Sequence, residues 1–213
     1  MPVRAAKPVK SLRHLFGSAF LLLVCLFSAS ALAEAQRGAL TIPQALPELV
    51  DEAGIILRGR VLSARVEPHP ELQNLYTVVV TLRVERTLKG EAGETFTFRQ
   101  FIWDVRDRSN AAGYRKGQHL LLLLIKPSVH GLSSPAGLEQ GRFRIERTAD
   151  GREVAVNGAA NAGLFEGLES ALEKKGAQVR APLAARAQPH KSGPVALDDL
   201  EEIIAALVGA QQP

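Results

Sequence analysis

The fold is decided by one stretch of sequence, Tyr76-Thr77-Val78-Val79-Val80-Thr81-Leu82-Arg83-Val84-Glu85. Apolar and polar side chains alternate along it, with Val79 as the exception, and this period of two residues is typical of a strand with one buried face. A shift of one residue would expose five apolar side chains, each of which contributes about 1.5–3 kcal/mol when buried. Burial therefore fixes the register of the predicted strand, which extends to Leu88.

Further strands are predicted on both sides of this one. Alternating patterns cover residues 55–61 and 94–103, and residues 142–147 and 152–156 predict a hairpin around a Gly-containing turn. Residues 119–125 form an apolar run without alternation, which favours a strand buried on both faces. About six closely spaced strands without helical crossovers predict a mainly β fold, an antiparallel barrel or sandwich.

Short helices are expected beside these strands. Residues 46–53 and 164–175 have apolar residues at helical spacing, and residues 198–208 form a better-defined amphipathic helix. Asp198, with Glu201 three residues later, is predicted to cap this last helix. Residues 177–194 are rich in Ala, Pro and Gln and are interpreted as a flexible connector.

The N-terminal segment is predicted to be a secretory signal peptide. Four basic residues precede the apolar run 15–27, and Ala31-Leu32-Ala33 stands just before Glu34. The run has 13 residues, whereas a membrane-spanning helix needs about 20. We therefore expect cleavage between Ala33 and Glu34 and an exported protein, either periplasmic or extracellular. The expected organisation is a signal peptide (1–33), a β-barrel domain (34–157), a helix with connector (158–196) and a C-terminal helix (197–209).

Composition excludes several classes of function. The leader holds four of the 26 Lys and Arg residues and none of the 22 Asp and Glu residues, so the remaining chain has no net charge. Nucleic-acid binding draws its affinity from clustered cations, and we expect no nucleic-acid partner. The one Cys also lies in the leader, which excludes disulfides, thiolate metal sites and a cysteine nucleophile from the exported part. No transmembrane span is expected after cleavage, and no cofactor is assigned.

Three further segments follow one another in a characteristic order. They are Asp51-Glu52-Ala53-Gly54-Ile55-Ile56-Leu57-Arg58-Gly59-Arg60-Val61, then Tyr76-Thr77-Val78-Val79-Val80 with Thr87-Leu88-Lys89-Gly90, then Tyr114-Arg115-Lys116-Gly117-Gln118-His119-Leu120-Leu121. This order resembles netrin-like domains, whose OB-type barrel also forms the inhibitory half of tissue inhibitors of metalloproteinases. Residues 137–144, Gly-Leu-Glu-Gln-Gly-Arg-Phe-Arg, are similar to a segment of exported bacterial proteins of no assigned role. The resemblance covers about residues 50–157 and implies an antiparallel OB-like barrel of about six strands with short flanking helices.

The resemblance also implies a class of partner. In the inhibitor family, the amine and carbonyl of an N-terminal Cys, held by a disulfide, chelate the zinc of the target protease. The expected mature chain begins at Glu34 and has no Cys, so contact with a protease would have to come from a barrel face. We expect a non-enzymatic module that binds a protein or a cell-envelope component, with a secreted metallopeptidase as the leading partner.

A candidate partner-binding surface lies on the predicted strand 94–103. By the parity of the buried positions, the side chains of Arg99, Phe101 and Trp103 point outward. Exposed aromatic residues beside Arg favour partner contacts, and OB-type barrels commonly bind ligands on their second and third strands. A bulge at Gln100-Phe101 would instead bury both rings, and the pattern favours this alternative, because bulges are common where barrel strands bend.

The alternative class of protein is a hydrolase or a metal-dependent enzyme whose site is assembled from scattered residues. Four histidines of the exported part lack any metal-binding spacing: His69, His119, His130 and His190. We interpret them as unpaired surface or strand-edge side chains. Three oxygen-bearing residues share a loop without the Gly and terminal Glu of an EF-hand, which indicates a solvated turn: Asp104, Asp107 and Asn110. Neither Ser133 nor Ser134 lies in a Gly-x-Ser-x-Gly turn. No catalytic or metal residue is assigned, and clustering of the histidines with Asp104 or Asp107 in one cleft would favour the enzyme.

Intact mass spectrometry tests the expected cleavage. The protein recovered from outside the cytoplasm is expected to begin at Glu34, because a small-x-small exit precedes that residue. A recovered chain that retains residues 1–33 would contradict the prediction.

Overall fold

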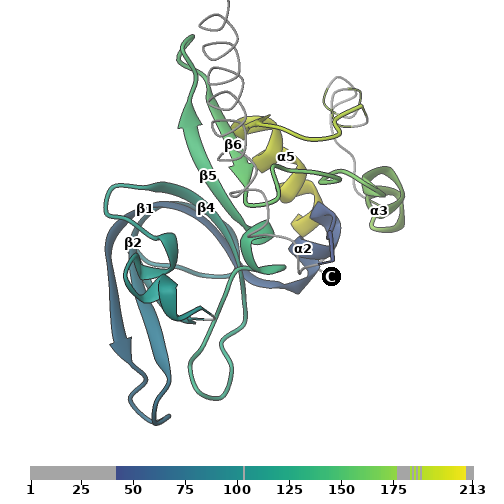
Figure 1. Ribbon diagram of the computed structural model, residues 1–213. Coiled ribbons are helices and arrows are strands. Elements are labelled where there is room, and N and C mark those ends of the chain that lie inside the picture. The colour runs from purple at the N-terminus through teal and green to yellow at the C-terminus, as the bar shows by residue number, and fades with distance from the viewer. Residues whose placement is uncertain are drawn as a thin grey trace, which may run out of the picture. The chain divides into compact units, whose positions relative to one another are not determined.

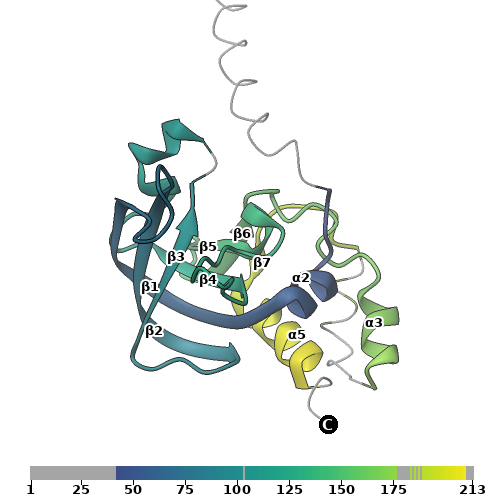
Figure 2. The ribbon, with the colours of Figure 1, turned by 90° about the horizontal axis from the view of Figure 1, so that it is seen from below.

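The strands of the computed structural model form one antiparallel sheet in the order β3-β2-β1-β4-β5-β6-β7 (Figures 1 and 2). The structure describes residues 42–102, 104–176, 183, 185, 187 and 189–209. The strands are β1 (Ala53–Pro68), β2 (Tyr76–Lys89), β3 (Thr95–Phe101), β4 (His119–Ile125), β5 (Arg142–Arg147), β6 (Glu153–Asn157) and β7 (Val195–Ala196). The helices are α2 (Leu46–Glu52), α3 (Leu168–Lys174) and α5 (Leu197–Gly209), with short 3-10 turns η1 (Val105–Arg108), η2 (Ala111–Gly113) and η3 (Leu138–Gly141).

The expected mainly β, antiparallel fold with short helices is confirmed, but the expected closure and strand number are not. In the described part of the chain the sheet ends at β3 on one side and at β7 on the other, and it does not close into a barrel. Two isolated bridges reach from β4 toward β3: Leu124 pairs with Pro135 in antiparallel fashion, and Arg99 pairs with Leu132 in parallel fashion. Strand β7 lies at the end of the segment 158–196, which was expected to hold a helix and a connector, and it pairs with β6. It was not predicted, because two residues carry too little pattern to be recognised.

Strands β1 and β2 bend because their pairing is interrupted. The register shifts between Ile56 and Leu57, between Arg58 and Gly59, and between Val61 and Ser63, and each such irregularity increases the local twist. Gly59 is required at the bend, since a Cβ atom there would lie 2.4 Å from the carbonyl oxygen of Arg83. The curved pair wraps one side of the molecule (Figure 2).

Strand β4 is buried on both faces, as the sequence predicted. Its residues Leu120 to Leu124 are all 0% exposed. Leu120, Leu122 and Leu124 belong to a core cluster inside the curved sheet, together with Leu57, Val80 and Phe98. Leu121 and Leu123 belong to a second core cluster on the opposite face.

The second cluster lies between the sheet and the helices. Helices α2, α3 and α5 lie on one side of the strands (Figure 2), and their apolar stripes pack against β4, β5 and β6 in this cluster. The predicted helix 164–175 begins later than expected, at Leu168, because Gly167 has a φ of +65° that ends the preceding turn.

Helix α5 carries an ion pair that its sequence did not reveal. Glu201, predicted to help cap the helix, is instead 1% exposed and faces the sheet. Its carboxylate accepts hydrogen bonds from Arg58 on β1 at 2.9 Å and from Arg86 on β2 at 2.6 Å. The buried carboxylate is thus satisfied by two guanidinium groups, and it ties α5 to the two longest strands.

The segment 137–144 has a structural role. The side-chain amide of Gln140 is 3% exposed; its oxygen accepts from the backbone N–H of Gln44 at 2.8 Å, and its nitrogen donates to the carbonyl of Ile42 at 3.1 Å. The neighbouring Gly141 allows close packing, because a Cβ atom there would lie 2.5 Å from the carbonyl oxygen of Ala136. This segment therefore anchors the first described residues of the chain to η3.

A pair of adjacent substitutions tests the parity of β2. Val80→Asp is expected to unfold the protein, because Val80 is 0% exposed and an unpaired buried carboxylate costs several kcal/mol out of a typical stability of about 5–15 kcal/mol. Thr81→Asp is the control, since Thr81 lies on the other face, half-buried beside Thr97. Thermal unfolding followed by circular dichroism measures both variants, and equal midpoints would contradict the register.

Candidate functional site

Strand β3, the predicted binding strand, keeps its alternation to the end. Its pairing with β2 runs from Arg83–Thr95 to Thr77–Phe101 without a shift. The bulge at Gln100-Phe101 that the sequence favoured is absent, so that interpretation is wrong. Gln100 is buried, whereas Phe101 is half-buried on the opposite face.

Of the three predicted partner-binding residues, the structure describes two. Arg99 and Phe101 share the outer face of β3, and Trp103 lies outside the described residues. The expected cleavage residues Ala33 and Glu34 also lie outside them. The grouping of Arg99, Phe101 and Trp103 into one surface therefore stays a prediction.

Arg99 is held in place by the two strands behind it. Its guanidinium donates to the Thr77 hydroxyl at 2.7 Å and to a Glu67 carboxylate oxygen at 3.1 Å. Its backbone carbonyl accepts from the N–H of Ser133 at 2.8 Å. Arg99 is thus a fixed and partly neutralised cation at the point where the segment after β4 meets β3.

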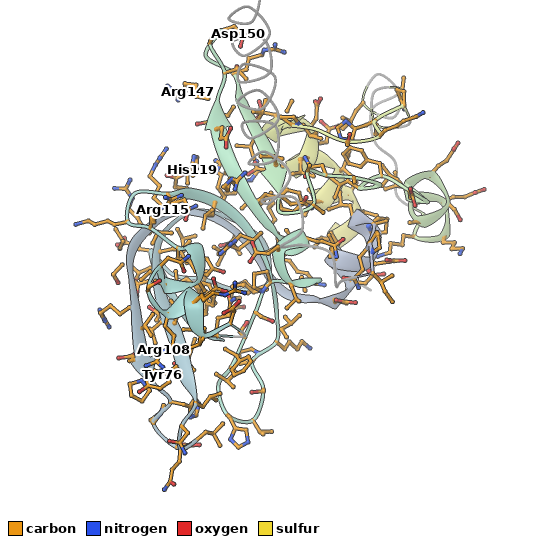
Figure 3. The ribbon with its side chains drawn as sticks, in the orientation of Figure 1. Tyr76, Arg108, Arg115, His119, Arg147 and Asp150 are labelled. Carbon is orange, nitrogen blue, oxygen red and sulfur yellow. The ribbon has the colours of Figure 1, made fainter. Side chains whose placement is uncertain are left out.

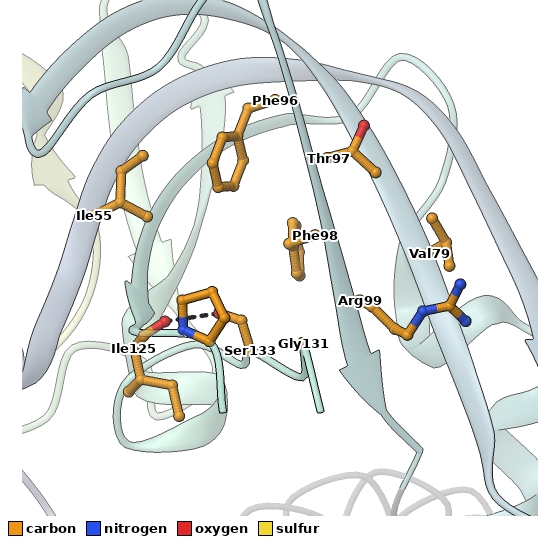
Figure 4. Close-up of a pocket in the computed structure, with 10 residues that line it drawn as sticks. Ile55, Val79, Phe96, Thr97, Phe98, Arg99, Ile125, Gly131 and Ser133 are labelled. Carbon is orange, nitrogen blue, oxygen red and sulfur yellow. Dashed lines mark hydrogen bonds between the residues drawn. The ribbon is translucent and has the colours of Figure 1, made fainter. Parts of the chain in front are cut away.

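A pocket of about 310 Å³ opens beside the free edge of β3. Figure 4 shows Phe96 and Phe98 on one side of the strand and Thr97 and Arg99 on the other. Its wall is mostly apolar and comes from β1, β2, β3, the end of β4 and the segment after it: Ile55, Val79, Phe96, Thr97, Phe98, Arg99, Ile125, Pro127, Gly131 and Ser133. A volume of this size is at the lower end of the range for small-ligand sites.

The hydroxyl groups of the pocket are already engaged. Ser133 is buried and donates to the carbonyl oxygen of Ile125 at 2.8 Å. The Thr97 hydroxyl lies 3.0 Å from that of Thr81. Among the described residues, neither hydroxyl is bonded to a histidine or a carboxylate, so the wall offers shape and apolar contact rather than an activated nucleophile.

His69 joins the two loops that flank this region. Its Nδ1 accepts from the backbone N–H groups of Glu71 at 3.2 Å and Leu72 at 3.0 Å, and its Nε2 donates to the carbonyl oxygen of His130 at 3.0 Å. These partners assign the neutral tautomer with the proton on Nε2. Nδ1 therefore stabilises the β1–β2 loop, and Nε2 connects that loop to the loop after β4.

His119 lies apart from this pair, in a charged cluster on the helix-facing side of the sheet (Figure 3). Its Nε2 is 2.7 Å from a carboxylate oxygen of Glu85, and its Nδ1 is 3.4 Å from a guanidinium nitrogen of Arg60. Glu153 lies 3.9 Å from the same Nδ1. The prediction of unpaired histidines is thus wrong for His69 and His119, whereas His130 is a surface residue as predicted, with its Nδ1 3.8 Å from Glu71.

His190, the fourth histidine, packs edge-on against Phe165 with 5.4 Å between ring centroids. Its buried Nε2 has no hydrogen-bond partner among the described residues, and burial lowers the pKa of the ring. The side chain therefore has an apolar packing role.

The loop after β3 is organised by capping. Asp104 accepts from the backbone N–H of Arg106 at 2.9 Å and forms an ion pair with its guanidinium. Arg108 lies over the ring of Tyr76, with 3.3 Å from the guanidinium carbon to the ring centroid (Figure 3).

In the described residues, no group of three or more His, Cys, Asp or Glu side chains is placed to hold a metal ion.

Comparisons with protein-family models, with curated proteins and with solved structures gave no match. Within the described part of the chain, no helix is long and apolar enough to cross a membrane. Function must therefore be inferred from the geometry of the site.

Sequence patterns missed most of the pocket, because its wall combines residues from four separate segments. One signal was present in Val79, which breaks the alternation of β2. It is 8% exposed and lines the pocket from the outer face. An apolar residue at an outward position of a strand thus marked the place where another segment covers the sheet.

Tyr114, at the inner side of β3, gives a pH-dependent test of this packing. Its hydroxyl donates to the side-chain oxygen of buried Gln100 at 2.8 Å, and burial raises the pKa of the phenol to about 12. Between about pH 10 and pH 12 the unfolded chain releases this proton while the folded chain retains it, so stability falls as the pH rises. The expected loss is on the order of 2–3 kcal/mol.

Urea unfolding at pH 9 and at pH 11 measures about half of this loss, roughly 1.3 kcal/mol, because pH 11 lies only about one unit above the ordinary pKa of the phenol in the unfolded chain. Tyr114→Phe is expected to reduce the difference between the two values, because it removes the titrating group. An unchanged pH dependence in Tyr114→Phe would assign the effect to other groups.

Proposed function

We propose that the chain is an exported, OB-like binding module that recognises a protein or a cell-envelope component at the pocket beside β3. The proposal is carried by the chemistry of the pocket wall, which is apolar apart from one guanidinium and two engaged hydroxyls. Such walls bind apolar groups and fix their orientation with a few polar contacts.

The strand connections support an OB-like arrangement that is incompletely closed. Strands β1, β2 and β3 form a meander, β4 pairs with β1, and the segment 132–135 bridges β4 and β3. OB-type barrels are partly open, and their ligands commonly bind between the second and third strands and two neighbouring loops. The pocket wall includes residues of β2 and β3, and His69 joins the β1–β2 loop to the loop after β4, which supports an OB-like mode of binding.

The pocket wall favours binding over catalysis. Its ten lining residues include no histidine, carboxylate or cysteine, and acid–base or nucleophilic chemistry uses such groups. His69 and His130 lie together, but each ring nitrogen of His69 has a structural partner. A secreted metallopeptidase remains the leading partner class, because of the netrin-like resemblance, with contact through the β3 region.

Affinity capture from the native envelope and secreted fractions tests the proposal. The chain is expected to retain a defined partner, and Phe96→Ala is expected to weaken its capture by about tenfold, because the ring forms part of the pocket wall. Leu62→Ala is the matched control: Leu62 is an apolar β-strand residue, 40% exposed, outside the pocket. Thermal midpoints of both variants separate binding loss from unfolding.

Trp103→Ala tests the wider surface predicted from the sequence. If Arg99, Phe101 and Trp103 form the centre of the contact, this variant is expected to lose capture and keep its stability. Loss of stability without a selective loss of capture would show that the ring belongs to the core. Absence of any partner with the unaltered chain would overturn the proposed function.

A further inference from the structure

Within the described part of the chain, the backbone of β3 is paired with β2 on one side and only at Arg99 on the other. The N–H of Ile102 donates to the carbonyl of Tyr76, and the N–H of Val84 donates to the carbonyl of Glu94. The backbone N–H and C=O groups of the even-numbered residues of β3 therefore point toward β2. The carbonyl of Arg99 instead accepts from Ser133, on the opposite side. By the alternation of an antiparallel ladder, the N–H and C=O groups of Thr95 and Thr97 also point away from β2.

The segment that covers Arg99 does not continue along this edge. Ser128 accepts from the N–H of Gly131 at 2.9 Å and donates its own N–H to Leu132 at 2.8 Å, so the chain turns away after one parallel bridge. Among the described residues, Thr95 and Thr97 have no backbone partner on the outer side. The pocket of about 310 Å³ lies at this position and is lined by Phe96, Thr97 and Gly131.

We propose that an extended peptide segment of a partner protein adds to β3 at Thr95–Thr97 and places an apolar side chain in the pocket. The proposal rests on the proposed function and names the form of its partner. Alternating donors and acceptors along a strand edge are matched by another extended backbone. The bridge between Arg99 and Leu132 demonstrates that this edge accepts a neighbouring strand.

The charges beside the edge define the composition of the peptide. Glu94 is exposed at the start of β3, and Arg99 lies at the other end of the unpaired stretch. The pocket wall contains this one cation and no carboxylate. Because Arg99 is already paired with Glu67, the complementary segment carries a basic residue near Glu94 and an apolar residue at the pocket.

A displayed library of random linear peptides, selected on the purified full chain, is the probe. Selected sequences are expected to alternate apolar and polar residues, with a basic residue at the end that lies near Glu94. Thr97→Pro is expected to reduce their binding by about tenfold or more, because it removes an outward N–H without breaking a bond to β2. Thr97→Val is the matched control, since it removes only the hydroxyl and keeps the N–H.

Methylation of the peptide amides provides a readout that does not depend on protein variants. Methyl groups on the alternate amides that face β3 are expected to abolish binding, whereas methyl groups on the other amides are expected to preserve it. Equal effects of both patterns would overturn strand addition. Equal binding by Thr97→Pro and the unaltered chain, or failure to select any peptide, would also overturn it.

Two further outcomes distinguish peptide addition to β3 from self-association of the chain and from partner binding at another surface. In the first, no peptide is selected, and the chain self-associates in sedimentation experiments unless it carries Thr97→Pro. This result would overturn the peptide as the ligand of β3 and identify a second copy of the chain in its place. Capture of the same native partner by the unaltered chain and by Thr97→Pro would leave the proposed function standing and reject only the edge of β3 as its contact.

Discussion

The arrangement of the whole molecule depends on one strand that has no solvent-facing side. Residues Leu120 to Leu124 of β4 are completely buried, and their alternate side chains belong to two different core clusters. The same strand pairs with β1 on one edge and with β5 on the other. The curved strands and the helix-covered strands therefore share a structural element, and loss of its packing weakens both parts at once.

Charged groups are placed where this shared core ends. Glu201 joins α5 to Arg58 and Arg86, and His119 joins the beginning of β4 to Glu85. These contacts orient elements that apolar packing leaves free to slide, because a charged hydrogen bond has a narrow geometry. The pocket beside β3 contains none of these charged residues, and its wall is built mainly from apolar side chains.

Sequence patterns predicted the parts of the fold that depend on local periodicity. Three patterns each predicted their element: the alternation of β2, the apolar run of β4 and the apolar stripe of α5. They did so because burial imposes a fixed period on long elements. Contacts between distant segments were not predictable. Glu201 was assigned to a cap because its partners Arg58 and Arg86 are more than 100 residues away, and β7 is too short for any pattern. The open side of the sheet also escaped prediction, because closure depends on where residues 128–135 turn.

The contact made by Gln140 determines where the foldable unit begins. Its buried side-chain amide has the backbone of Ile42 and Gln44 as partners, so a chain that starts at α2 or β1 would leave a buried amide unsatisfied, at a cost of about 1–3 kcal/mol. The extended residues before α2 thus supply the hydrogen-bond partners of a buried side chain in η3. Circular permutation would be tolerated at exposed turns such as the one around Gly151. A new terminus between Gln44 and α2 would instead break the covalent link between α2 and the residues that bond Gln140.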